Sequence, residues 1–363
     1  MSAGYARRLA EVGAADKSSV GGKAAGLGEL GRAGIPVPPG FVVLAEAFGQ
    51  ALAAVDPSGS LVRSVASLPA SDVRAIARAA AGVRERIKAV PLPTEVEAQI
   101  TAMYEALDPR VPAPVVAVRS SATMEDSATA SFAGMQDTYL AVRGAAAVLD
   151  AVRRCWASLY NDESVAYRRR LGLPEDGLAM GVVVQRMLRP RAAGVMFSRS
   201  PVTGDRSVVA IEGTWGLGSA LVAGEVTPDR FTVSKVTGEI TGRRVGAKLR
   251  LHSFGSGSNE PGISSSAMPL ALRGTPCLTD DEARALALVG QRIEDLYGVP
   301  QDIEWAMIGD DPACPPMHGD PADRIRLLQS RPETVWAARS QAPVATPKPR
   351  ASDHILAWLE KPL

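Results

Sequence analysis

Two carboxylates near the C-terminal end of the sequence have the spacing of side chains that share one face of a strand. In the segment QDIEWAM, Asp302 and Glu304 are separated by one residue, so an extended chain would point both to the same side. Ile303 and Trp305 would then point to the other side, into a core. Paired carboxylates suit Mg²⁺, a hard cation that takes oxygen ligands and usually shares them with substrate phosphates. A solvated strand face without a ligand is the alternative interpretation.

A second pair with the same spacing follows in the segment LLQSRP. Gln329 and Arg331 would share a strand face, and if this strand pairs with the preceding one, an amide and a guanidinium would lie beside the two carboxylates. Arginine suits bidentate contacts with phosphate. The two pairs together favour a site for a phosphate-containing ligand.

Two glycine-containing segments could supply further phosphate contacts. In SFAGMQDTY, Gly134 and its small neighbours would allow backbone amides to close around an anion, and a surface hairpin turn is the alternative. In GGK, Lys23 would lie in the first turn of a helix, where a lysine and free backbone N–H groups can hold phosphate. A purely structural helix start is the alternative there. These segments indicate a site for a Mg-nucleotide or a phosphorylated metabolite, assembled from distant parts of the chain.

The elements that must position these residues change in type along the chain. Up to about residue 110, apolar residues at helical spacing predict helices that begin near Ser19, near Val73 and behind a TxxE capping box at Thr94. The run PVVAVRSSA predicts a strand that carries Arg119 and ends in a loop. A further helix is expected around residues 155–170.

The second half of the chain is richer in strands. Residues 178–245 contain several strand candidates in succession, which predict one largely antiparallel sheet. The Gly-, Ser- and Pro-rich residues 253–276 predict a long exposed loop or lid. A capping box at Thr279 and Glu282 predicts the start of a helix, after which the two strands with the paired polar residues complete the chain's second part.

Length, charge and cysteine content exclude several classes of protein. The chain has 363 residues, 46% of them hydrophobic, so two packed lobes fit better than one and a disordered chain is excluded. A formal net charge of +1 supplies no global field for a nucleic acid or an anionic membrane. No apolar run approaches the roughly 18–20 residues that span a bilayer, and three cysteines without a CxxC pair fit a reducing compartment. We therefore expect a cytoplasmic protein with neither a nucleic-acid nor a membrane partner.

Ordered motifs along the chain resemble those of a known family. They are VGGKAAGLGEL, GIPVPPGFVV, VAVRSSATMEDSATASFAGMQDTYL, CWASLYNDESVAYR, VVVQRML, AGVMFSRSPVTG, WGLGSALVAGEVTPDRF, DIEWAM and LQSRPETV. From about Asp16 to Val335 the chain is similar to the N-terminal ATP-binding domain of phosphoenolpyruvate synthase, which pyruvate phosphate dikinase and rifampin phosphotransferase share. The resemblance implies an α+β ATP-grasp fold that holds ATP between lobes expected at residues 1–175 and 176–337, followed by a linker and short amphipathic tail at 338–363.

The resemblance also implies roles for individual residues. It implies phosphate-binding cations at Lys23 and Arg119, and an adenine contact at Gln185 in VVVQRML. It implies a loop over the β- and γ-phosphates made by Gly134, Met135, Gln136, Asp137 and Thr138. It places the Mg²⁺ and nucleotide carboxylates at Asp302 and Glu304, and a polar pair at Gln329 and Arg331. Catalysis in such enzymes is chiefly charge neutralisation and positioning, which would fall to Lys23, Arg119 and Arg331.

Two departures from the family pattern shape the expected function. None of the three histidines lies in the family's phosphohistidine motif, so we expect the histidine on a separate partner subunit, an arrangement that resembles phenylphosphate synthase. The apolar residues 355–359 could dock that partner or pack on the chain's own surface. Relatives usually have WGLGE where this chain has WGLGS, so Ser219 replaces an expected nucleotide-contacting glutamate, for which Glu212 or Glu225 are candidate substitutes.

The sequence therefore predicts the ATP-binding component of a dikinase-type phosphotransferase. Such a component cleaves Mg-ATP to AMP and phosphate and passes the β-phosphate to a histidine of the partner. The alternatives are a non-catalytic nucleotide-sensing module and a simple ADP-forming small-molecule kinase. The final acceptor is not specified by these residues, because family specificity lies in other domains.

Overall fold

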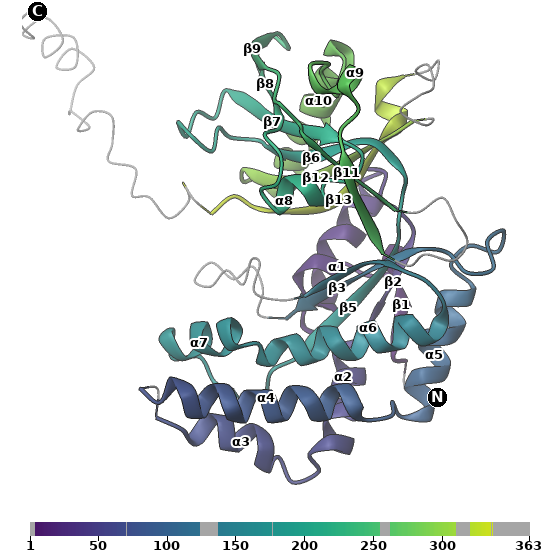
Figure 1. The fold of residues 1–363 in the computed structure, drawn as a ribbon, viewed down its shortest axis with the longest axis vertical. Coiled ribbons are helices and arrows are strands. Elements are labelled where there is room, and N and C mark those ends of the chain that lie inside the picture. Colours follow the sequence, from purple (N-terminus) through teal and green to yellow (C-terminus); the bar gives the residue numbers. More distant parts are fainter. Residues whose placement is uncertain are drawn as a thin grey trace, which may run out of the picture.

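The computed structural model describes residues 4–69, 71–123, 137–175, 177–254, 262–309, 320–334 and 336. These residues form a mixture of helices and antiparallel sheets, as the α+β prediction requires. A five-stranded and a six-stranded sheet lie in different halves of the molecule, and a two-stranded ribbon accompanies them (Figure 1). No helix within the described ranges is long and apolar enough to cross a membrane.

The five-stranded sheet collects strands from three separate parts of the sequence. In spatial order it contains β1 (Ala6–Arg8), β2 (Gly40–Val43), β5 (Met180–Arg186), β3 (Val116–Ala122) and β4 (Thr138–Val142), each antiparallel to its neighbour. The membership of β5 corrects the expectation that residues 178–245 form one sheet. The chain changes sheets between Arg186 and Pro190, beyond the boundary expected at residues 175 and 176.

Helices cover the five-stranded sheet and share its core. They are α2 (Ala45–Val55), α3 (Ser60–Ser67), α4 (Val73–Ala89), α5 (Thr94–Glu105), α6 (Ala145–Ala157) and α7 (Asp162–Arg170). Figure 1 shows α3, α4, α6 and α7 on the side of this sheet that faces away from the six-stranded sheet. Their apolar faces bury large side chains such as Trp156 and Phe48 against strand residues such as Val182. Burial of this kind is the main force that holds the sheet in place.

The six-stranded sheet carries the paired polar residues. Its order is β13 (Ile325–Pro332), β12 (Gln301–Ile308), β6 (Pro190–Phe197), β7 (Val208–Trp215), β8 (Asp229–Ser234) and β9 (Ile240–Arg244). The long helix α10 (Asp280–Tyr297) packs against it and buries Leu286 and Ile293 in a second core. The short helices α8 (Ser219–Val222) and α9 (Leu270–Arg273) and the antiparallel ribbon of β10 (Arg250–Phe254) and β11 (Ile263–Ala267) complete this half.

Helix α1 (Lys17–Arg32) joins the two halves. It contacts β3 and β5 of the first sheet and β13 of the second. Leu30 lies in the second core, whereas Leu27 and Ala24 lie in a smaller core against Val183 of β5. Within the described ranges, four 3₁₀ turns connect other elements: η1 (Leu9–Glu11), η2 (Ala14–Asp16), η3 (Ser158–Tyr160) and η4 (Pro321–Arg324).

Several local predictions need correction. The capping box at Thr279 and Glu282 is confirmed, but Pro93 takes the N-cap position before α5, so Thr94 is already inside that helix. The helix expected over 155–170 is interrupted by η3 and divides between α6 and α7. The expected loop at 253–276 contains β11 and α9. The tail at 338–363 lies outside the described residues.

Candidate active site

The two strands with paired polar residues are neighbours, and their register brings the pairs together. Strand β12 is antiparallel to β13, with Asp302 opposite Arg331 and Glu304 opposite Gln329. Trp305, on the other face, is fully buried in the second core. Alternate side chains of β12 therefore lie on opposite faces of the strand, Asp302 and Glu304 on the polar face and Ile303 and Trp305 in the core, as the sequence predicted.

Arg119 of β3 connects the two sheets at this polar face. Its Nη1 donates a hydrogen bond to the Leu328 carbonyl at 2.8 Å, and its Nη2 donates to Glu304 Oε2 at 2.8 Å and to Gln329 Oε1 at 3.0 Å. The Arg119 side chain is 12% exposed and that of Glu304 is 31% exposed. Burial opposes ionisation of Glu304, but the charge and hydrogen bond of Arg119, together with the charges of Lys23 and Arg331, outweigh it and lower the pKa of this carboxyl.

Asp302 and Arg331 form a separate pair on the same face. Arg331 donates from Nε at 2.9 Å and from Nη2 at 2.7 Å to Asp302 Oδ2. Burial raises the pKa of Asp302, and the neighbouring Arg331 only partly opposes this effect. Both carboxylates of the predicted metal pair are therefore held by arginines from other strands.

Lys23 reaches the same region from α1. A kink at Gly21, where φ is +78°, ends the first turn of α1, so that Lys23 begins the regular part of the helix. Its Nζ donates to the Ser120 carbonyl at 2.8 Å, next to Arg119. The charge of Lys23 contributes to the lowered pKa of Glu304, which places the lysine within electrostatic reach of that carboxylate.

A cavity of about 390 Å³ opens beside this cluster, between the two sheets. Four of the predicted residues are in its wall: Arg119, Thr138, Gln185 and Glu304. Gln185, on β5, is buried, and its Nε2 donates to the Pro38 carbonyl at 3.1 Å. Lys23, Asp302, Gln329 and Arg331 are not among the described lining residues and reach the cluster through the contacts given above.

The predicted phosphate loop is described only in part. Gly134, Met135 and Gln136 lie outside the described residues. The carboxylate of Asp137 accepts hydrogen bonds from the Tyr139 hydroxyl at 2.6 Å and from Asn161 Nδ2 at 3.1 Å, so it is engaged in fixing the start of β4. Thr138 pairs with Arg119 across β4 and β3 and lines the cavity.

Ser219 also lines the cavity, whereas neither of the two candidate glutamates is among the described residues of the cavity wall. Glu212 is on β7 and forms an ion pair with Arg230 at 2.8 Å. The Glu225 carboxylate contacts the His252 ring instead. His252 itself forms a hydrogen bond with Ser219. This contact is not predictable from residue spacing, because 33 residues separate the two and strand β10 has no distinctive motif.

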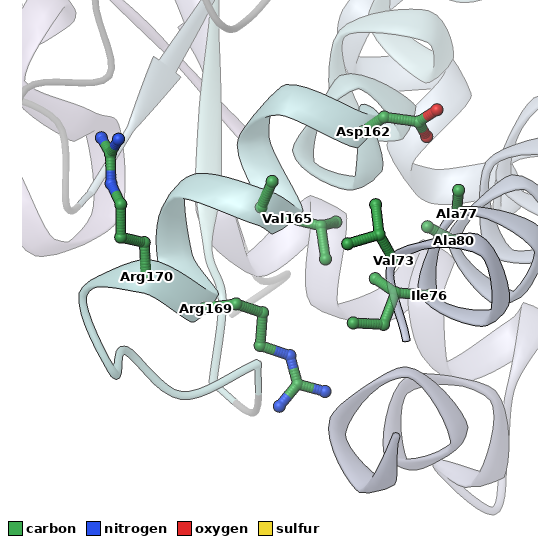
Figure 2. A pocket seen from close by; sticks show the side chains of 9 residues that line it. Val73, Ile76, Ala77, Ala80, Asp162, Val165, Arg169 and Arg170 are labelled. Atoms are coloured by element: carbon green, nitrogen blue, oxygen red, sulfur yellow. The ribbon is translucent and has the colours of Figure 1, made fainter. Parts of the chain in front are cut away.

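A second cavity, of about 230 Å³, lies between α4 and α7 (Figure 2). Its wall is largely apolar, with Val73 and Ile76 on α4 facing Val165 on α7. Arg169 is engaged with the carbonyls of Val65, Ala66 and Leu68 at the end of α3. The other charged residues of this wall are Asp162, which pairs with Arg84 at 2.8 Å, and Arg170, which lies over the Tyr167 ring. The first cavity, where Arg119 meets Glu304, is therefore the candidate nucleotide site.

Comparison with known proteins identifies the family of this chain. The family described as pyruvate phosphate dikinase, AMP/ATP-binding domain, matches residues 17–352. The chain belongs to this family. It is 44% identical over 330 residues to a rifampicin phosphotransferase from a Streptomyces species, covering 90% of this chain and 36% of the relative.

Two further relatives have the names of phosphoenolpyruvate synthases. A probable phosphoenolpyruvate synthase of Methanothermobacter thermautotrophicus is 40% identical over 333 residues, covering 91% of this chain and 46% of the relative. The phosphoenolpyruvate synthase of Aeropyrum pernix is 37% identical over 352 residues, covering 90% and 42%. The chain thus spans less than half the length of each of these relatives.

Proposed function

We propose that this chain binds Mg-ATP in the cavity between its two sheets, as an ATP-grasp module, and supplies the phosphoryl group in a dikinase-type transfer. The observation that carries the proposal is Arg119, which lines the cavity from β3 and bonds Glu304 and Gln329 on the opposite sheet. A cation from one sheet and a carboxylate from the other thus meet at the wall of one cavity, in a family described as AMP/ATP-binding. Gln185, which lines the same cavity from β5, would contact the base.

The chain's own side chains would act by neutralising and positioning phosphates. Arg119 and Lys23 carry positive charge to the cavity from β3 and α1, and Arg331 adds a third cation beside Asp302. In phosphoryl transfer most of the catalytic effect comes from such positioning and from stabilising negative charge that develops on the phosphate oxygens. Because the bonds of Arg119 fix its guanidinium, it would need little reorganisation when the nucleotide binds.

The donor set on β12 fits Mg²⁺. Asp302 and Glu304 place two carboxylates on one strand face, and Mg²⁺ is usually held by one or two carboxylates together with substrate phosphates and water. In the described part of the chain no group of three or more His, Cys, Asp or Glu side chains could hold a metal alone, so the nucleotide would have to supply ligands. Bound there, the ion would shield the phosphate charges during transfer.

The phosphate would pass to a histidine outside the described site. The relatives are more than twice as long as the matched region, so the remaining steps of such a reaction belong to other domains or to a partner subunit. We propose that this histidine receives the β-phosphate while AMP and inorganic phosphate are released. A nucleotide-sensing module without turnover is the second candidate, favoured by Ser219 in place of an acidic residue.

Calorimetric titration with a non-hydrolysable ATP analogue tests the binding site. We expect Mg-dependent binding by the wild-type chain and binding about 10- to 100-fold weaker in Glu304→Gln, the range for losing one charged contact. The control is Glu163→Gln, which changes an exposed glutamate in the first turn of α7 and should leave the affinity unchanged. Equal affinity in wild type and Glu304→Gln would contradict the assignment of the site.

A further inference from the structure

A chain of three polar side chains ends at the wall of the nucleotide cavity. Ser219 Oγ lies 3.0 Å from His252 Nδ1, and His252 Nε2 lies 3.2 Å from Glu225 Oε2. Ser219 lines the cavity, whereas His252 and Glu225 stand behind it. Ser219, which replaces the expected glutamate, is therefore held by His252, and His252 is held in turn by Glu225.

The backbone fixes the position of His252. The His252 carbonyl accepts a hydrogen bond from the Leu217 amide at 2.9 Å, and Gly216 forms a parallel bridge with His252. A Cβ at Gly216 would lie 2.6 Å from the His252 carbonyl oxygen, and φ there is +71°, so this close approach requires glycine. The His252 residue is 8% exposed. The segment that follows β7 and strand β10 are thus held together by backbone contacts next to Ser219.

The chemistry of the three groups determines which way the Ser219 hydroxyl points. A carboxylate only accepts hydrogen bonds, so the proton of the imidazole belongs on Nε2, facing Glu225. In this neutral tautomer Nδ1 is an acceptor, so the Ser219 hydroxyl, 3.0 Å away, would donate a hydrogen bond to it. The lone pairs of Ser219 Oγ remain for a ligand in the cavity. Ser219 would therefore attract a hydrogen-bond donor rather than a phosphate oxygen, which only accepts.

We infer that Ser219 accepts a hydrogen bond from a donor on the nucleoside part of the bound nucleotide and that His252 is the positioning residue for this contact. The inference rests on the proposed nucleotide site. A nucleoside offers two kinds of hydrogen-bond donor, the sugar hydroxyls and the exocyclic amine of the base. In either case the contact would select the nucleoside, while Arg119 and Lys23 serve the phosphates.

Binding of four nucleotides distinguishes these sources. Affinities of the full chain for ATP, 2′-deoxy-ATP, 3′-deoxy-ATP and ITP are measured by calorimetry in Mg²⁺. We expect wild type to bind one of the three analogues about three- to tenfold more weakly than ATP, which identifies the donor that Ser219 contacts. Ser219→Ala should bind ATP weaker by the same factor and should no longer distinguish ATP from that analogue.

Variants of His252 test its positioning role. His252→Ala should lose discrimination as Ser219→Ala does, whereas in His252→Asn the amide oxygen can still accept from Ser219 and should restore much of it. Ser253→Ala is the matched control, because Ser253 is the next residue but bonds to Ser264 on the exposed ribbon. Melting temperatures of all variants show whether they remain folded.

The outcomes separate this inference from the proposed function. A folded wild-type chain that binds no ATP overturns both. Binding that depends on Glu304 but is unchanged in Ser219→Ala overturns the inference alone. Weaker binding in Ser219→Ala with wild-type behaviour in His252→Ala overturns the positioning role of His252.

Discussion

Arg119 is the residue on which the geometry of the site depends most. It bonds a backbone carbonyl, a carboxylate and an amide on β13 and β12, although it belongs to the other sheet. Lysine could supply the charge but not several directed N–H groups. The guanidinium connects the two sheets and, in the proposed site, would also be a cation for phosphate, so a substitution should affect both stability and binding.

Arg119→Ala should destabilise the chain in a pH-dependent way. Because the pKa of Glu304 is lowered in the folded chain, its ionised form stabilises the fold at pH values above the ordinary pKa of 4.5. This contribution is lost as the pH falls through the lowered pKa. We expect a loss of about 1–3 kcal/mol near pH 7, shrinking below about pH 4, since the unpaired carboxyl is then protonated. Urea unfolding of wild type, Arg119→Ala and Arg119→Lys at pH 3 to 8 measures this, and a loss that does not vary with pH over this range would refute the explanation.

The sequence predicted individual residues best where one strand carries the pattern. The spacing of Asp302 and Glu304, and of Gln329 and Arg331, predicted shared faces, and the register of β12 with β13 confirms that the two pairs lie opposite each other. The contact of Ser219 with His252 was not predictable, because it depends on how a loop and a distant strand meet. Residue spacing carries no information about contacts of that kind.

At the scale of elements, α1 depends on one glycine at its start. Gly21 has φ of +78°, and a Cβ there would lie 1.9 Å from the Ser121 carbonyl oxygen. This close approach brings α1 against β3 and sets the position of Lys23 beside Ser120. An L-residue at position 21 would have to adopt a strained backbone conformation and move the helix away from the strand.

Gly21→Ala should therefore cost about 1–3 kcal/mol of unfolding free energy and weaken nucleotide binding through Lys23. Gly26→Ala is the matched control, because Gly26 lies in the same helix and the nearest atom to its Cβ would be 3.6 Å away. That control should be neutral or stabilising by up to about 1 kcal/mol, since alanine favours helix. Thermal unfolding and ATP titration of both variants check this, and equal behaviour of the two would contradict the role of Gly21.

Element types were easier to predict than element partners. The helices with clear apolar spacing, such as α4 and α10, formed as expected. Strand β5 was assigned to the wrong sheet because it is buried on both faces, and a continuous apolar run fits the centre of either sheet. The ribbon β10–β11 was missed because its serines lie on an exposed face and provide little hydrophobic pattern.

At the scale of the whole molecule, the cavity lies where two separately packed halves meet. Each sheet has its own hydrophobic core, and α1 and Arg119 are the connections described above. A ligand between them is contacted by side chains from distant parts of the chain, as ligands at the boundary of two packed units commonly are. In the proposed function, a nucleotide would bind in this cavity and its phosphates would be met by a group from another domain or chain.

The proposed transfer predicts a labelled histidine outside this module. The balanced step is ATP, water and a histidine giving AMP, inorganic phosphate and phosphohistidine, so ATP labelled with ³²P at the β-position should label the acceptor. We expect the purified chain, added with Mg²⁺ to a native lysate of its source, to label a polypeptide with acid-labile, alkali-stable phosphate and to form AMP. The Glu304→Gln chain should not do so. Formation of ADP without such a label would favour a simple kinase. Nucleotide binding without formation of either AMP or ADP would favour the sensing module, because turnover requires the acceptor whereas binding in the cavity does not.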